Sequence, residues 1–328
     1  RGKPEKVSTD SQITPQVSSS KQGRYEVAKE ISTPDGFINT DNITVSGQTG
    51  KNVVLIDFWT YSCINCQRTI PYLNAWYEKY KDKGLVIIGV HTPEFTFEHN
   101  YENVKKAVEK FGIKYPVALD NDYSTWHAYR NQYWPRKYLI DIDGYIVYDH
   151  IGEGAYEETE KKIQEALSER MQVLNLKEKI EKDMAKPTVA AIDPAKLRSP
   201  ETYFGSARNS LGNGQSNKTG MQTFSLPSSM QPNKAYLAGD WDIQEEFAEN
   251  KSSVAKIVFN YTAKNVYLVA GADKPVTVEV RRDGKLVKTI QVQTHQLYPL
   301  IEEADYSQHI LELTISTPGL QTFTFTFG

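Results

Sequence analysis

The chain contains two cysteines, which are separated by two residues in the sequence Cys63-Ile64-Asn65-Cys66, shortly after an apolar run that ends at Trp59. If both lie in the first turn of a helix, their sulfurs are within bonding reach, and the free backbone N–H groups and the helix dipole stabilise a thiolate. Cys63 can then attack a disulfide of another protein, and Cys66, one turn deeper, can resolve the mixed disulfide. The spacing therefore predicts thiol-disulfide exchange that needs no cofactor beyond a reversible Cys63–Cys66 disulfide.

Two other uses of such a pair fit the sequence less well. Half of a zinc site has the same spacing, but zinc needs four ligands. The chain has no third cysteine and its six histidines are scattered, so we expect no metal at the pair. A structural disulfide across two residues closes a very short loop and adds little stability.

Asp57 is a candidate proton acceptor for the cysteine pair. It precedes Cys63 on a run that otherwise consists of Val, Leu, Ile, Phe and Trp. A carboxyl group in apolar surroundings has a raised pKa, so Asp57 can take the proton from the buried thiol of Cys66. A slip of one residue in the strand would instead turn Asp57 toward water.

Two more candidates come from the segments around the predicted sheet. Glu94 follows the second core strand, at the sheet end where catalytic groups gather, and we expect a second proton carrier there. An exposed loop glutamate is the alternative, and His91 nearby is expected to be a packed or turn residue. Pro135 stands just before a strand, and we expect its peptide bond with Trp134 to be cis, which would leave backbone groups free to pair with an extended substrate. An ordinary trans proline that opens an edge strand is the alternative.

Length and composition indicate two domains. At about 100 to 200 residues per domain, 328 residues provide two ordinary cores. The net charge of -3 gives no basic field, so nucleic acid is not an expected partner. Residues 1–24 are rich in Ser, Gln, Lys, Thr and Pro, and we expect a disordered linker that remains after removal of a signal peptide or membrane segment. A boundary within a soluble protein is the alternative.

Residues 25–186 are expected to form an α/β domain. Helical and strand periods alternate along this part of the chain, and the cysteines follow the first strand of the core. We expect strands at 51–59, 85–90 and 115–119, a hairpin over 137–148 around Asp143-Gly144, and helices at 63–83, 101–111 and from about Ile163 to about Lys186. This order of elements is the thioredoxin-like layout.

The period changes to two beyond a linker at residues 187–200, which three prolines mark. Residues 201–328 predict an all-β antiparallel sandwich, jelly-roll-like, with a hairpin turn at Asp283-Gly284. The alternating apolar positions are Ile257, Phe259 and Tyr261; Val276, Val278 and Val280; Leu311, Leu313 and Ile315; and Phe323, Phe325 and Phe327.

Both halves of the chain resemble one known family. The segments that carry the resemblance are Phe58 to Arg68, Gly89 to Glu94, Ala118 to Asn121, Tyr133 to Asp141, Pro200 to Gly205, Leu237 to Trp241, Asp283-Gly284 and Phe325 to Gly328. They are similar to the extracytoplasmic region of the DipZ proteins, which belong to the TlpA and ResA group of thioredoxin-like enzymes. In that family the second half is a carbohydrate-binding-module-like sandwich.

The resemblance implies a protein-disulfide reductase on the outer face of the cell membrane. A membrane domain of the CcdA or DsbD type would precede the chain and pass electrons to it from cytoplasmic thioredoxin, with residues 1–24 as the tether. By motif match, Cys63 is the attacking thiol, Cys66 the resolving thiol and Pro135 the cis-proline. The substrates implied are protein disulfides.

The resemblance also assigns the residues around the pair. Asp57 matches the buried aspartate of thioredoxin, and Glu94 matches an active-site glutamate of the ResA group. Trp59 and Trp134 join Pro135 in the expected substrate groove. Trp134 departs from thioredoxins, where small or β-branched residues are common before the proline, so we expect a narrowed groove.

Two rival functions remain open from the sequence. A thiol peroxidase is one, because Thr60 lies three residues before Cys63 as in the peroxiredoxin pattern, although Ile56 replaces its proline. The other is a module that binds cell-wall glycan or docks a protein and carries the redox domain as cargo. Trp241 and Tyr298 are the candidates for stacking on sugars, with Tyr236, Tyr261 and Tyr267 as further aromatic side chains. Core packing is the alternative for these residues.

Overall fold

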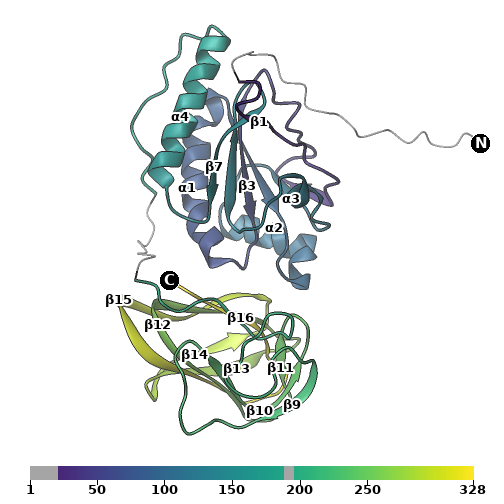
Figure 1. Ribbon diagram of the computed structural model, residues 1–328, viewed down its shortest axis with the longest axis vertical. Helices are drawn as coiled ribbons and strands as arrows, with labels where there is room; N and C mark the ends of the chain where they lie inside the picture. Colours follow the sequence, from purple (N-terminus) through teal and green to yellow (C-terminus); the bar gives the residue numbers. More distant parts are fainter. Residues whose placement is uncertain (1–20, 188–195) are drawn as a thin grey trace, which may run out of the picture. The chain divides into compact units, whose positions relative to one another are not determined.

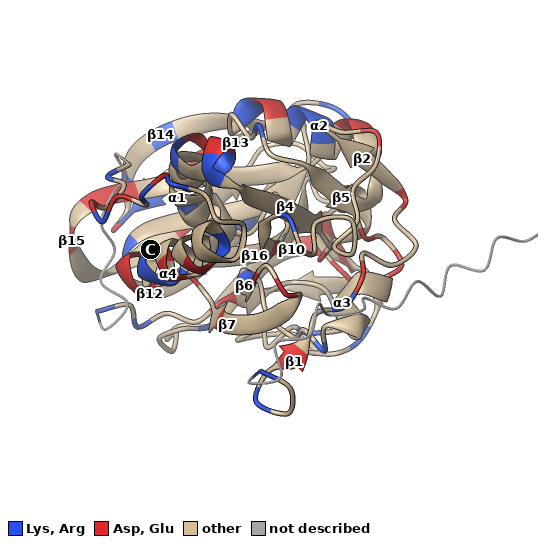
Figure 2. Ribbon diagram, turned by 90° about the horizontal axis from the view of Figure 1, so that it is seen from above, with Lys and Arg blue, Asp and Glu red and all other residues tan. Residues whose placement is uncertain are grey.

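The computed structural model describes residues 21–187 and 196–328, which fall into two compact units, Arg1–Val189 and Ala190–Gly328 (Figure 1). The predicted linkers at 1–24 and 187–200 therefore lie largely outside the described residues. Residues 21–24 differ from the prediction, since they form turns and Lys21 pairs with carboxylates of the first unit. Lys, Arg and Glu residues all occur along helices of the first unit (Figure 2).

The first unit is a mixed seven-stranded sheet with helices on both faces, in the strand order β1-β7-β6-β3-β4-β5-β2. Strands β3, β4 and β5 are parallel, and the remaining neighbours pair antiparallel. The strands are β1 (Glu26–Val27), β2 (Gly36–Ile38), β3 (Val53–Trp59), β4 (Leu85–His91), β5 (Val117–Leu119), β6 (Arg136–Ile140) and β7 (Tyr145–Ile151). The helices are α1 (Ile64–Tyr80), α2 (Tyr101–Lys110), α3 (Ser124–Ala128) and α4 (Tyr156–Val173), with 3-10 turns at Lys81–Lys83 and Thr96–His99.

Strand β3 lies at the centre of the sheet, and its seven side chains are all buried. Its odd-numbered apolar residues pack in one core with α1, α2 and α4, whereas its even-numbered residues pack in another with α3. Figure 1 shows α1 and α4 together on one side of the sheet. Because side chains alternate along a strand, Asp57 shares the face of Leu55 and Trp59, which is the α1 face.

Most predicted elements of this unit are confirmed, but the last helix is shorter than expected. Helix α4 ends at Val173 instead of continuing to about Lys186. The N–H of Leu176 donates to the carbonyl of Met171 (2.8 Å) and Asn175 has a φ of 53°, so a left-handed residue closes the helix. The chain then runs back along the helix, where the N–H of Ala185 donates to the carboxylate of Glu160.

The second unit is all-β, and its strands pair antiparallel around one core. Strands β12 and β15 are long enough to take part in both layers of the sandwich. The first half of β12 pairs with β10, its second half pairs with β16, and β15 follows it along most of its length. The strands are β8 (Thr202–Tyr203), β9 (Gly220–Phe224), β10 (Ala235–Ile243), β11 (Ala248–Asn250), β12 (Ala255–Gly271), β13 (Val276–Arg282), β14 (Lys285–Val292), β15 (Gln296–Ile315) and β16 (Gln321–Phe327).

The alternating apolar residues predicted for these strands are all buried, which confirms their strand period. The predicted turn at Asp283-Gly284 joins β13 to β14, and both residues have positive φ values of 50° and 78°. Two positive φ values in a two-residue hairpin loop are the conformation that Asp-Gly favours.

Candidate functional site

Cys63 and Cys66 occupy the amino-terminal end of α1, directly after the central strand. Cys63 is the N-cap residue of this helix, and its Sγ accepts a hydrogen bond from the backbone N–H of Cys66 at 3.4 Å. Both are free thiols; Cys63 is half-buried and Cys66 is fully buried. The two sulfurs therefore differ in access, since only Cys63 reaches the surface where another protein's disulfide can approach.

Asp57 is buried on the same side of the sheet as Cys66. Burial raises the pKa of its carboxyl to about 7, although the charge of Lys137 acts in the opposite direction. Burial also raises the pKa of the Cys66 thiol, and the neighbouring Cys63 and Asp57 add to this shift. Asp57 Oδ1 has no hydrogen-bond partner among the described residues, so it is available to a proton from Cys66.

Lys137 is a residue of this site that sequence reasoning missed. It is 0% exposed and lies opposite Asp57 in the ladder between β6 and β3. Burial lowers its pKa, while the charges of Asp57, Cys66 and Glu153 favour its protonated form. Its Nζ donates to the carbonyl of Gly152 at 3.3 Å. A signal was present in the sequence, because Lys137 precedes the buried Leu139 by two residues and so faces the same core.

Glu98 is a second site residue that sequence reasoning missed. Its carboxylate is fully buried and joins the loop before Cys63 to the loop after β4. Oε1 accepts from the backbone N–H of Ser62 (3.1 Å) and from its hydroxyl (2.7 Å). Oε2 accepts from the backbone N–H groups of Glu94 (2.7 Å) and Phe95 (3.0 Å). Burial raises the pKa of Glu98, and the hydrogen bond from Ser62 opposes this.

The predicted residues of the loop after β4 have different positions. Glu94 is half-buried, and its backbone is fixed by Glu98. A proton-carrying role for its side chain stays a prediction. His91 is fully buried, as expected for a packed residue, with its Nε2 3.5 Å from Thr60 Oγ1 and its ring stacked on Tyr61. Burial lowers the pKa of His91 to about 3.

The segment that leads into β6 contains a cis peptide bond between Trp134 and Pro135, which confirms that prediction. The indole of Trp134 is half-buried, and its Nε1 donates to the carbonyl of Thr92 at 3.0 Å. Its ring also lies 4.3 Å from that of Trp126. Trp134 is therefore held between α3 and the loop after β4, and both Trp134 and Cys63 pack at the margin of the α1-side core.

The expectation that Trp59 lines a substrate groove is wrong. It is 0% exposed and belongs to the α1-side core, because it has the same parity on β3 as Val53 and Leu55. Its ring packs edge-on against His91 at 5.0 Å. A substrate at the surface has no access to Trp59.

The sugar-stacking role for which Trp241 was a candidate is ruled out, and its core-packing alternative is confirmed. Its side chain is 0% exposed in the core of the second unit, and its Nε1 donates to the carbonyl of Ala238 at 2.9 Å. Tyr236 and Tyr261 are buried as well. Tyr298 packs partly against the core, and its hydroxyl donates to the carbonyl of Thr294 at 2.6 Å. The core-packing alternative holds for the buried three.

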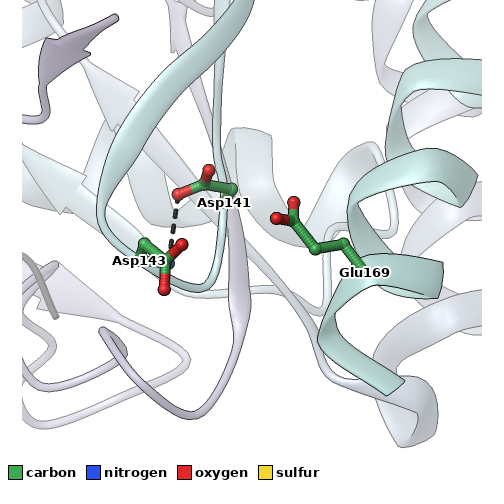
Figure 3. Close-up of side chains that lie close together, drawn as sticks. All are labelled: Asp141, Asp143 and Glu169. Atoms are coloured by element: carbon green, nitrogen blue, oxygen red, sulfur yellow. Dashed lines mark hydrogen bonds between the residues drawn. The ribbon is translucent and has the colours of Figure 1, made fainter. Parts of the chain in front are cut away.

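An acidic cluster lies on the first unit away from the cysteines. Asp141 and Asp143, from the turn between β6 and β7, approach Glu169 of α4 (Figure 3). The ammonium of Lys21 lies among them, at 2.6 Å from Asp141, 2.9 Å from Asp143 and 2.6 Å from Glu169. Although burial disfavours its charge, the hydrogen bonds to these carboxylates raise the pKa of Lys21. The chain itself thus supplies the cation for this cluster.

The site combines a half-buried cysteine at the start of a helix with a buried partner thiol and a buried carboxyl group. A cis-proline precedes a neighbouring strand of the same thioredoxin-like sheet. This combination defines the class of protein to which the first unit belongs. The first unit is a thioredoxin-like thiol-disulfide oxidoreductase. Family models agree: residues 28–167 match the family described as Redoxin, and residues 199–328 match the family described as Thioredoxin like C-terminal domain.

Comparison with known proteins identifies the family. The chain belongs to the DipZ family, and it is 39% identical to Protein DipZ of Mycobacterium tuberculosis over 326 residues, which are 95% of this chain and 45% of the relative. It thus spans about half the length of the DipZ relatives that it matches. It is also 36% identical over 141 residues to Thiol-disulfide oxidoreductase ResA of Bacillus anthracis, covering 42% of this chain and 76% of ResA.

Solved structures that are similar to part of this chain include a thioredoxin-like protein in the oxidized form. It is 26% identical, with a TM-score of 0.41, and the match covers 44% of this chain and 97% of that chain.

Within residues 21–187 and 196–328, no helix is long and apolar enough to span a membrane.

Proposed function

We propose that this chain is an extracytoplasmic protein-disulfide reductase that receives its electrons from a membrane domain of the CcdA or DsbD type. The proposal of a reductase rests mainly on the unequal burial of Cys63 and Cys66. Cys63 is half-exposed at the helix start, whereas Cys66 is 1% exposed beside Asp57. This arrangement suits an attacking thiol and a resolving thiol.

The proposed reaction moves two electrons to the substrate. The Cys63 thiolate attacks one sulfur of a protein disulfide, the substrate S–S bond breaks, and the departing thiolate takes a proton. Cys66 then transfers its proton to Asp57 and attacks Cys63, so the mixed disulfide breaks and the second substrate thiolate leaves. The substrate is reduced and the chain holds a Cys63–Cys66 disulfide, which the membrane donor must reduce for another cycle.

The electron supply and the location are supported by the size of the relatives. The DipZ proteins are about twice as long as the region that this chain matches, so they contain a further portion that can serve as a donor in the same polypeptide. Residues 1–24 have the composition of a tether. A tethered donor would act at high effective concentration.

Equilibration of the Cys63–Cys66 pair with glutathione buffers tests the proposal. A pair that a donor keeps reduced should have a potential near the thioredoxin end of the known range, about -270 mV, rather than near DsbA, about -120 mV. A value close to DsbA would contradict the reductase assignment. Thr60 Oγ1 lies 3.5 Å from His91 Nε2 in the buried interior, so the peroxidase alternative gains no support, and peroxide consumption with a thiol donor should be negligible.

For the second unit we propose a protein-docking or scaffold role in preference to glycan binding. Stacking on sugars needs exposed ring faces, and those of Trp241, Tyr236 and Tyr261 are buried. Titration of cell-wall glycans should therefore leave the intrinsic tryptophan fluorescence unchanged. Saturable quenching that persists in the Cys63→Ala variant would favour the glycan alternative.

A further inference from the structure

The loop between β7 and α4 contacts several parts of the cysteine site. It comprises residues 152–155, and Gly152, Gly154 and Ala155 have positive φ values of 82°, 90° and 46°. The N–H of Gly152 donates to the carbonyl of Pro135 at 2.8 Å. Its own carbonyl accepts from the buried ammonium of Lys137 at 3.3 Å. One residue of this loop thus connects the cis-proline segment to the lysine opposite Asp57.

Glu153, the next residue, connects the loop to helix α1. Its carboxylate accepts two hydrogen bonds from Arg68, from Nε at 2.8 Å and from Nη2 at 2.7 Å. Nη2 also donates to Oδ1 of Asn65, the residue directly before Cys66, at 2.5 Å. The Arg68 and Glu153 side chains are 13% and 20% exposed, so the ion pair has little contact with water. A two-point contact of this kind fixes orientation as well as distance.

We propose that Glu153 and Arg68 are positioning residues for the Cys63–Cys66 pair: their ion pair fixes Asn65, which lies between the two cysteines in the sequence, and balances the charge at this end of helix α1. Glu153 also acts on Lys137, whose protonated form its charge favours. This inference rests on the dithiol chemistry of the proposed function. It adds that the balance of Glu153 against Arg68 sets how readily the pair is reduced.

The charge balance predicts shifts of opposite sign. A dithiol whose thiolate form is stabilised is a stronger oxidant. Glu153→Gln leaves the guanidinium of Arg68 without its carboxylate, and an unbalanced positive charge at this end of helix α1 should stabilise a thiolate of the pair. Loss of the Glu153 charge also weakens the protonation of Lys137, which acts on the thiolate in the opposite direction, and the proposal takes the effect of Arg68 to be the larger of the two. Arg68→Met leaves the carboxylate without its cation and should act in the reverse direction.

The experiment measures the equilibrium of each variant of the 328-residue chain with glutathione buffers at pH 7. We expect Glu153→Gln to shift the equilibrium constant about tenfold toward the dithiol, equal to about 30 mV less negative, and Arg68→Met to shift it by a similar factor toward the disulfide. Glu153→Asp, which retains the charge, should stay within about threefold of the original chain. Glu165→Gln is the matched control, since Glu165 lies exposed on α4 and pairs with Lys162.

The outcomes separate this inference from the proposed function. Shifts of the same sign in Glu153→Gln and Arg68→Met, or none in either, would overturn the charge balance and leave a loop that only holds the fold. If the unaltered chain has a potential near DsbA, the reductase assignment fails, whereas opposite shifts around that value would still support the role of the ion pair. Should Glu153→Gln fail to fold, the other two variants still decide the question. The proposal expects Arg68→Met to shift the equilibrium constant toward the disulfide and Glu153→Asp to leave it nearly unchanged.

Discussion

Asp57 and Lys137 lie opposite one another on β3 and β6, and both side chains are buried. Burial works against the charge of each, so the pKa of Asp57 is raised to about 7 and that of Lys137 is lowered. A general base is most effective when its pKa is near the working pH. The cross-strand pair therefore places a group that can accept and release a proton near neutrality beside Cys66.

Asp57→Asn should stabilise the chain at alkaline pH while it slows the resolving step. Because the pKa of Asp57 is near 7 in the folded state and 3.8 as the ordinary value, the folded state binds more protons between these values. The free energy of unfolding of the original chain therefore falls as the pH rises from 3.8 to about 7. At pH 8 we expect the free energy of unfolding of the variant to exceed that of the original chain by about 4 kcal/mol, less what Lys137 loses without its partner, and at pH 4 we expect almost no difference. Urea unfolding at both values tests this, and an equal gain at both would contradict it.

The thiol assignment predicts which variant traps a substrate. Cys66→Ala should accumulate mixed disulfides through Cys63, because the resolving attack is missing. Cys63→Ala should accumulate none, since the remaining thiol is 1% exposed. Non-reducing electrophoresis with a model disulfide protein reads out the adducts. Trapping by Cys63→Ala instead would reverse the two roles.

Glu98→Gln should loosen the loop that leads into Cys63. An amide has one acceptor oxygen, whereas the carboxylate of Glu98 receives donors on both oxygens from Ser62, Glu94 and Phe95. One set of donors would be left unpaired in the interior, at a cost of about 1–3 kcal/mol in the free energy of unfolding. Urea titration gives this value, and Glu102→Gln in the first turn of α2 is the control. Equal stability of both variants would show that Glu98 does not hold the loop.

Lys21→Ala should destabilise the first unit in a pH-dependent manner. Without the ammonium, the carboxylates of Asp141, Asp143 and Glu169 repel one another, and we expect a loss of about 2 kcal/mol at pH 7. Repulsion raises the carboxyl pKa values in the folded state, so the loss should shrink as pH falls toward 4. Thermal unfolding across this range measures it. Lys162→Ala, which breaks an exposed pair, should show little change, and a pH-independent loss in Lys21→Ala would argue against repulsion as the cause.

Local patterns were sufficient to predict the parts of the site that a single segment encodes. The apolar run before Cys63 predicted a buried central strand, which is β3. The alternation of side chains along this strand places Asp57 on the face that packs against α1. The same alternation places Trp59 in the core, and the motif-based expectation of a groove position overlooked it. Trp241 was left open between sugar stacking and core packing for a related reason, since alternation alone does not show which face of a strand is covered.

The residues that sequence reasoning missed depend on contacts between distant segments. Glu98 acts on Ser62, and Glu153 acts on Arg68, across intervals of 36 and 85 residues along the chain. No local period indicates such pairs. Lys21 was assigned to a disordered tail because its neighbours are polar, whereas its three carboxylate partners come from the β6–β7 turn and from α4. Only the folded chain brings these groups together.

The shared strands of the second unit have a consequence for how it opens. Because β12 pairs with β10, β15 and β16 along its length, neither layer can separate without breaking hydrogen bonds of the other. Amide hydrogens of both layers should therefore exchange together, in one global event rather than layer by layer. For the same reason, we expect proteolytic nicking within β12 or β15 to release no smaller stable fragment of the second unit.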